Sequence, residues 1–88
     1  MKLNADEKRC LDLLQEWSQQ GRVNCVSNEV IGALKLDAEK YKSVMKKMEE
    51  IGAIKVRLRG MGIDYAAYFT IPERRVLEEM AQLSADEL

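Results

Sequence analysis

Lys and Arg are the residues of this chain best suited to bind a ligand, and they are concentrated in one segment. Between Lys35 and Arg59 there are eight Lys or Arg residues and four Asp or Glu residues, whereas the rest of the chain has six and eleven. The formal charge of the whole chain is −1. A cationic segment on an acidic body is compatible with oriented phosphate contact, although the same side chains could simply solvate the surface of a helix.

Residues that support catalysis or metal binding are scarce. The chain has no histidine, which is the commonest metal ligand and the usual general base at neutral pH. Cys10 and Cys25 lack metal-ligand spacing and are expected to be buried and reduced, with a redox switch as the alternative. Gly60-Met61-Gly62 is too short for a nucleotide-binding loop and fits a hairpin tip. We therefore expect no enzyme activity, no cofactor and no metal site.

Hydrophobic periodicity places four of the eight basic residues of this segment on a helix over 37–51. Its apolar stripe is Tyr41, Val44, Met45, Met48 and Ile51. The opposite side carries Glu39, Ser43, Lys46 and Glu50, flanked by Lys40, Lys42 and Lys47. Asp37 is a suitable N-cap, and Gly52 allows a left-handed end. The period then changes to two over 54–59, which predicts a strand with a basic residue at every second position.

The preceding segments read as helix, short strand and helix. Asn4 and Glu7 resemble a capping box that opens a helix ending at Gly21. A weak strand over 22–26 follows, and Ser27 is expected to cap a second helix. Gly32 lies inside this helix, where it would be explained by a close helix–helix contact. Residues 35–37 then form a tight turn, so the second and third helices make a helix-turn-helix unit.

The sequence of the C-terminal part predicts a β-hairpin followed by a last helix. A strand over 65–71 returns from the hairpin tip, and Pro72 is suited to the start of a helix over 72–88. The apolar stripe of this helix is wider than docking alone needs, which favours homodimerisation over simple packing on the first helix. The expected dimer contacts are Val76, Leu77, Met80 and Leu83.

This order of elements resembles the winged helix-turn-helix superfamily, including MarR-like regulators. The resemblance is carried by Leu34, Leu36, Val44, Met45, Met48 and the run EEIGAIKV from Glu49 to Val56. It implies an α+β, mainly helical fold, with a three-helix core plus β-hairpin wing over 1–71 and an added C-terminal helix over 72–88. The superfamily contains both DNA-binding proteins and protein-docking modules.

The resemblance implies double-stranded DNA as the partner of a small dimeric transcriptional regulator. Helix 37–51 would enter the major groove, and the wing 54–71 would lie over phosphates or an adjacent minor groove. The implied DNA-binding residues are Lys40, Lys42, Ser43, Lys46, Lys47, Lys55, Arg57 and Arg59. No Arg, Asn or Gln lies on the outer side of that helix, so it lacks the side chains that make bidentate hydrogen bonds to base edges. Lysines occupy the positions aligned with the asparagine and tyrosine of the Z-form-binding branch, which excludes that branch.

The alternative is a protein–protein interaction adaptor without DNA binding, which the acidic balance and the outer glutamates Glu39 and Glu50 favour. The 88 residues suit one domain and contain no apolar run long enough to cross a bilayer. No membrane partner is expected, and the expected location is the cytoplasm, on the nucleoid if the chain binds DNA.

Overall fold

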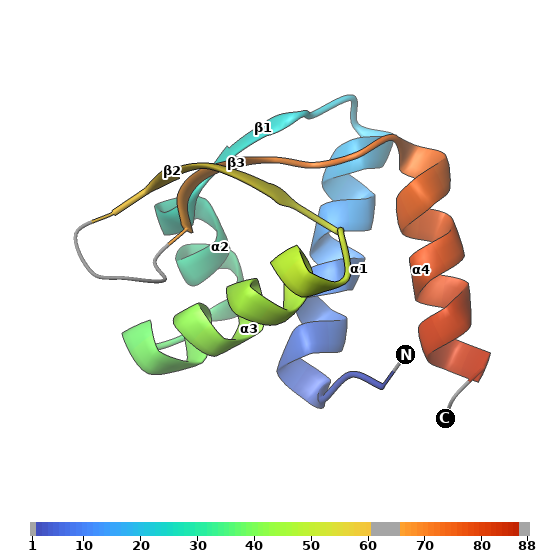
Figure 1. Cartoon of the computed structure of the whole chain (residues 1–88), viewed down its shortest axis with the longest axis horizontal. Helices are drawn as coiled ribbons and strands as arrows, with labels where there is room; N and C mark the ends of the chain where they lie inside the picture. Colours follow the sequence, from blue (N-terminus) through green and yellow to red (C-terminus); the bar gives the residue numbers. More distant parts are fainter. Residues whose placement is uncertain (1, 61–65, 87–88) are drawn as a thin grey trace.

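The computed structural model describes residues 2–60 and 66–86, which form an α+β fold with four helices and one antiparallel sheet (Figure 1). The elements are α1 (Ala5–Gln19), β1 (Asn24–Val26), α2 (Ser27–Leu34), α3 (Ala38–Glu50), β2 (Lys55–Arg59), β3 (Ala66–Thr70) and α4 (Arg74–Asp86). The strands lie in the order β1-β3-β2, so β3 is central. The predicted order of helices and strands is confirmed. None of the described helices combines the length and the hydropathy needed to span a bilayer.

The ends of α1 and α3 are set by the capping residues that the sequence predicts. Asn4 Oδ1 accepts the Glu7 N–H at 2.8 Å, and Glu7 Oε1 accepts the Asn4 N–H at 2.9 Å, which completes a capping box. Asp37 Oδ1 accepts the backbone N–H three residues further on at 2.8 Å. Gly21 and Gly52 follow the two helices with φ of 84° and 82°, in the left-handed region that glycine adopts easily.

Two predictions for α2 are wrong. Val26 occupies the N-cap position, and Ser27 is instead the first helical residue and is buried. Gly32 makes no close helix contact, because a Cβ built there would meet no atom within 4 Å outside its own helix. Nothing in the structure explains the glycine at this position. The predicted tight turn is confirmed: Lys35 is left-handed, with φ 55° and ψ 48°, and Leu36 is buried.

All four helices lie on the same side of the sheet, and the core fills the space between them and the strands (Figure 1). Phe69 of β3 is completely buried there, in the same core as the predicted apolar stripe of α3. Trp17 near the end of α1 is 9% exposed and belongs to the core. The fully buried side chains also include Leu14, Val30, Cys10 and Leu77.

Helix α4 packs against α1, and this contact uses part of the predicted dimer stripe (Figure 1). Leu77 has no exposed area, so its assignment to a subunit contact must be corrected. Met80 is partly buried against the core, and its Cε lies 3.6 Å from the position that a Cβ at Gly52 would occupy. Val76 is half-buried, and the Leu83 side chain lies outside the described residues. The helix begins at Arg74, two residues later than predicted.

The two faces of the sheet differ sharply. Cys25, Phe69 and Val56 are cross-strand partners, and this row faces the core, since Cys25 and Phe69 are buried. Because side chains alternate along a strand, the residues paired with Tyr68 and Thr70 lie on the other face. We call this face the outer sheet face. Its described side chains are Asn24, Val26, Lys55, Arg57, Leu58, Tyr68 and Thr70.

The free edge of β1 is covered by an ion pair. Glu29 Oε1 accepts the Val26 N–H at 3.4 Å, and Arg22 Nη2 donates to the Asn24 carbonyl at 3.3 Å. The two side chains pair with each other at 2.6 Å, and the Arg22 guanidinium lies 4.5 Å from the centre of the Trp17 ring. Backbone groups that would otherwise be open to another strand are therefore occupied.

Candidate nucleic-acid interface

The outer side of α3 presents lysines that have no ion pair among the described residues. Lys40, Ser43 and Lys46 are exposed, whereas Lys42 and Lys47 are half-buried. All five residues predicted on this helix therefore reach the surface, on the side opposite the core stripe. Lysine ammonium groups suit phosphate oxygens as point charges but do not read base edges in a bidentate manner.

Helix α3 is held rigidly under the sheet, which gives the lysines a defined position. Tyr41 is completely buried, and its hydroxyl donates a hydrogen bond to the Ala66 carbonyl of β3. Met45 and Met48 are buried in the same stripe, and Met45 Sδ lies 3.8 Å from Cys10 Sγ of α1. The helix is thereby tied both to the hairpin and to the rest of the core.

Arg59 is the one basic residue of β2 that joins α3. Its Nη2 lies 2.6 Å from Glu49 Oε2 near the end of the helix, and the two side chains are 46% and 38% exposed. This contact fixes the hairpin against the helix but neutralises the arginine. Sequence reasoning did not identify Glu49 as the ion-pair partner of Arg59. The available signal was that Glu49 lies just before the turn at Gly52 that leads into β2.

Lys55 and Arg57 lie on the outer sheet face, away from α3. Lys55 is the partner of Thr70, and Arg57 Nε donates to Thr70 Oγ1 at 3.3 Å. The register shifts between Val56 and Arg59 break the strict alternation that the sequence predicts. The eight predicted DNA-binding residues are therefore divided between two faces, with six on the α3 side and two on the outer sheet face.

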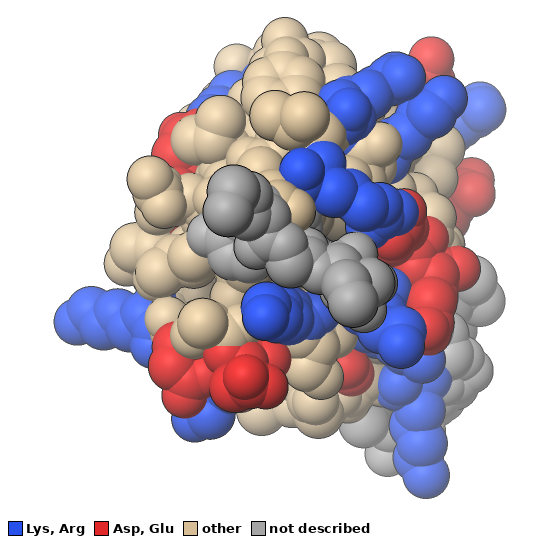
Figure 2. Space-filling view, turned by 60° about the vertical axis from the view of Figure 1, so that its left-hand side comes forward, with Lys and Arg blue, Asp and Glu red and all other residues tan. Residues whose placement is uncertain are grey.

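The surface that carries the hairpin is mixed in charge. Figure 2 shows Lys and Arg atoms in an upper and a lower group, with Asp and Glu atoms between them and at the lower left. Glu39 and Glu50 are exposed on α3, and Glu49 is half-exposed beside Arg59. Any phosphate near α3 would meet both attractive and repulsive groups.

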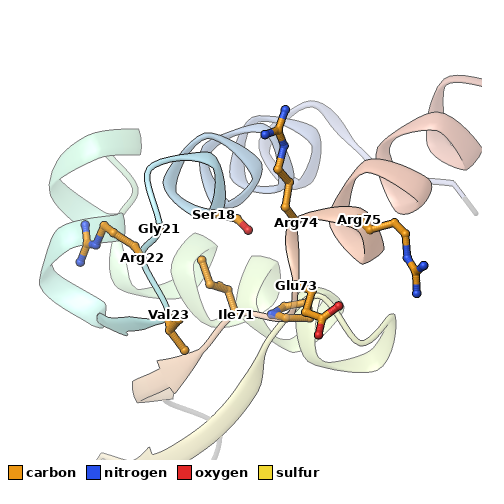
Figure 3. A pocket seen from close by; sticks show the side chains of 9 residues that line it. Ser18, Gly21, Arg22, Val23, Ile71, Glu73, Arg74 and Arg75 are labelled. Atoms are coloured by element: carbon orange, nitrogen blue, oxygen red, sulfur yellow. The ribbon is translucent and has the colours of Figure 1, made fainter.

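A hollow of about 480 Å³ lies between the end of α1, the loop that leads to β1 and the start of α4, and it is not an anion site (Figure 3). The guanidinium groups of Arg22, Arg74 and Arg75 point in different directions around it. Arg22 is paired with Glu29, and Arg74 is paired with Glu78 at 2.8 Å. The basic groups therefore do not converge on a ligand.

Both cysteines are free and buried, as predicted. Burial raises the pKa of the Cys10 thiol from 9.0 to about 12. The pKa of Cys25 is also raised, chiefly by burial, while the Arg22 charge acts in the opposite direction. Thiols with raised pKa values are poor nucleophiles, which argues against a thiolate-based redox site at either position.

The chain matches no protein-family model, and neither curated proteins nor solved structures give a match.

Proposed function

We propose that this chain is a winged helix-turn-helix protein that binds duplex DNA through α3 and the β2–β3 hairpin, as a small dimeric transcriptional regulator. The observation that carries the proposal is the division of α3 into two sides. Tyr41, Val44, Met45 and Met48 are buried, while the opposite side presents lysines without ion-pair partners among the described residues. The helix-turn-helix arrangement of α2 and α3 supports the same assignment.

Phosphate contact, more than base readout, would supply the affinity. The α3 lysines are point charges, and Arg59 is the hairpin arginine on the same side. Contacts of this kind release counterions, so log Kd should depend steeply on log salt concentration. A dimer would place two α3 helices on half-sites about one duplex turn apart. Val76, as a half-buried residue of α4, remains available for such a contact.

The test is the double variant Lys42→Glu with Lys46→Glu, measured by gel shift and fluorescence anisotropy on duplex DNA at low salt. We expect binding to be lost, because two phosphate contacts become repulsive. The matched control is Lys2→Glu with Arg75→Glu, which makes the same change in net charge at exposed positions away from α3. Circular dichroism must show that both variants are folded. Unchanged affinity of the α3 variant would refute the proposal.

A protein–protein adaptor is the second candidate, and the mixed charge of the hairpin surface favours it (Figure 2). Glu49 neutralises Arg59, and Glu39 and Glu50 are exposed on α3. Absence of duplex binding by the wild-type chain at low salt, together with co-purification of a defined partner protein, would select this candidate.

A further inference from the structure

The outer sheet face has an apolar row at its centre. Val26, Tyr68 and Leu58 are cross-strand partners, one from each strand. Val26 is 40% exposed, Leu58 is 62% exposed, and Tyr68 between them is half-buried. Because all four helices lie on the other side of the sheet, none of them covers this row (Figure 1). This contiguous apolar row therefore offers a flat surface that a ligand could contact.

The same face is positively charged. Lys55 and Arg57 are exposed, and Arg57 is held over the face by its hydrogen bond to Thr70. None of the three strands contains Asp or Glu. The carboxylate of Glu29, which reaches the β1 backbone, is already paired with Arg22. The charge of this face therefore complements an anionic ligand.

These groups match the two parts of a nucleotide. Residues two apart on one face of a strand are about 7 Å from each other, and neighbouring strands are about 5 Å apart. A base stacked on Tyr68 would thus have its phosphates within reach of the Lys55 and Arg57 side chains. Flat aromatic and aliphatic surfaces bordered by cations are the usual platform for single strands, whose bases are free to stack.

We propose that the outer sheet face binds a single-stranded polynucleotide, with Tyr68 stacking against a base and with Lys55 and Arg57 contacting phosphates. This site is independent of the duplex site proposed on α3, because it uses other residues on the opposite face of the sheet. Two other occupants fit less well. A second copy stacked on this face would bring cations against cations. A protein partner would need a recess to hold an anchoring side chain, and the hollow described above lies elsewhere.

The test uses fluorescein-labelled single-stranded 12-mers of mixed pyrimidine sequence, as DNA and as RNA, in anisotropy titrations at about 50 mM salt, where phosphate contacts are strong. Tyr68→Leu keeps an apolar side chain but removes the ring, so we expect affinity to fall at least about fivefold. Tyr68→Phe keeps the ring and should bind like the wild type. Lys55→Glu with Arg57→Glu should abolish binding. A preference between the two 12-mers would show which polynucleotide the face takes.

The duplex-site variant Lys42→Glu with Lys46→Glu separates the two proposals. It should retain single-strand binding if the outer sheet face is the site, whatever becomes of duplex binding. The inference is overturned if the wild-type chain does not bind either 12-mer, or if Tyr68→Leu binds like the wild type. It is also overturned if the α3 variant loses single-strand binding as completely as the Lys55 and Arg57 variant. Folding of each variant is checked by circular dichroism, and amide chemical shifts on titration should change in β2 and β3.

Discussion

The Glu49–Arg59 pair offers a sharp test of duplex binding, because its removal should strengthen the interaction. Substituting Glu49→Gln keeps the size of the side chain and removes a negative charge 2.6 Å from Arg59. Two changes follow near the proposed DNA. A carboxylate no longer repels phosphates, and the Arg59 guanidinium becomes free to contact one. Most substitutions in a binding site weaken binding, so an increase in affinity would be informative.

The size of the effect follows from Coulomb's law. Removing a charge about 8 Å from a phosphate is worth about 0.5 kcal/mol in water, and a new contact at about 4 Å is worth about 1 kcal/mol. After allowance for ordering the arginine side chain, we expect a gain of about 1–1.4 kcal/mol, which is a five- to tenfold lower Kd. One additional phosphate contact should also steepen the dependence of log Kd on log salt by about 0.9.

The assay is a duplex titration by fluorescence anisotropy over a series of salt concentrations. Glu78→Gln is the matched control, because Glu78 forms a similar exposed pair with Arg74, at 2.8 Å, on α4. That variant makes the same change in net charge and should alter the Kd less than twofold. The half-exposed pair contributes at most about 1 kcal/mol to folding, so Glu49→Gln should remain folded. If Glu49→Gln shows the wild-type Kd and salt slope, then α3 and the hairpin are not the duplex site.

Two further predictions concern stability. Gly32→Ala should raise the free energy of unfolding by about 0.5–1 kcal/mol in urea titrations, because the position is helical and open and alanine has the better helix propensity. A loss of stability would contradict this reasoning. Cys10 should make the protein less stable at alkaline pH, since its thiol stays protonated to about pH 12 when folded but ionises near pH 9 when unfolded. Between pH 8 and pH 10 this contribution should fall by about 1.4 kcal/mol, and the pH dependence of the melting temperature should be correspondingly weaker in Cys10→Ala.

The order of elements was predictable because local signals agreed with one another. Asn4 with Glu7, and Asp37 with Gly52, marked helix ends through hydrogen bonds between residues a few positions apart. The apolar stripe of α3 follows from helix periodicity alone. The N-cap error in α2 arose where a local rule had a competitor, whereas nothing in the structure explains Gly32. Val26 occupies the N-cap position, and the Glu29 carboxylate accepts the backbone N–H of Val26. A Ser27 cap is therefore not needed.

The candidate site was predictable only in part. The lysines of α3 lie on the surface because their spacing opposes the core stripe, and this is a property of a single helix. The separation of Arg59 from Lys55 and Arg57 depends instead on register shifts between β2 and β3, which are set by pairing with another strand.

Local sequence patterns therefore specify which segments are helices and strands, where most of them end, and which side of α3 is polar, since these depend on neighbours within one or two turns. Tertiary structure decided the rest. It paired Arg59 with Glu49, buried Leu77 of α4 in the core, and placed Tyr68 with Lys55 and Arg57 on an open sheet face. These outcomes bring together residues that are distant in the chain, and the packing of elements against one another, not any local pattern, determines which of them meet.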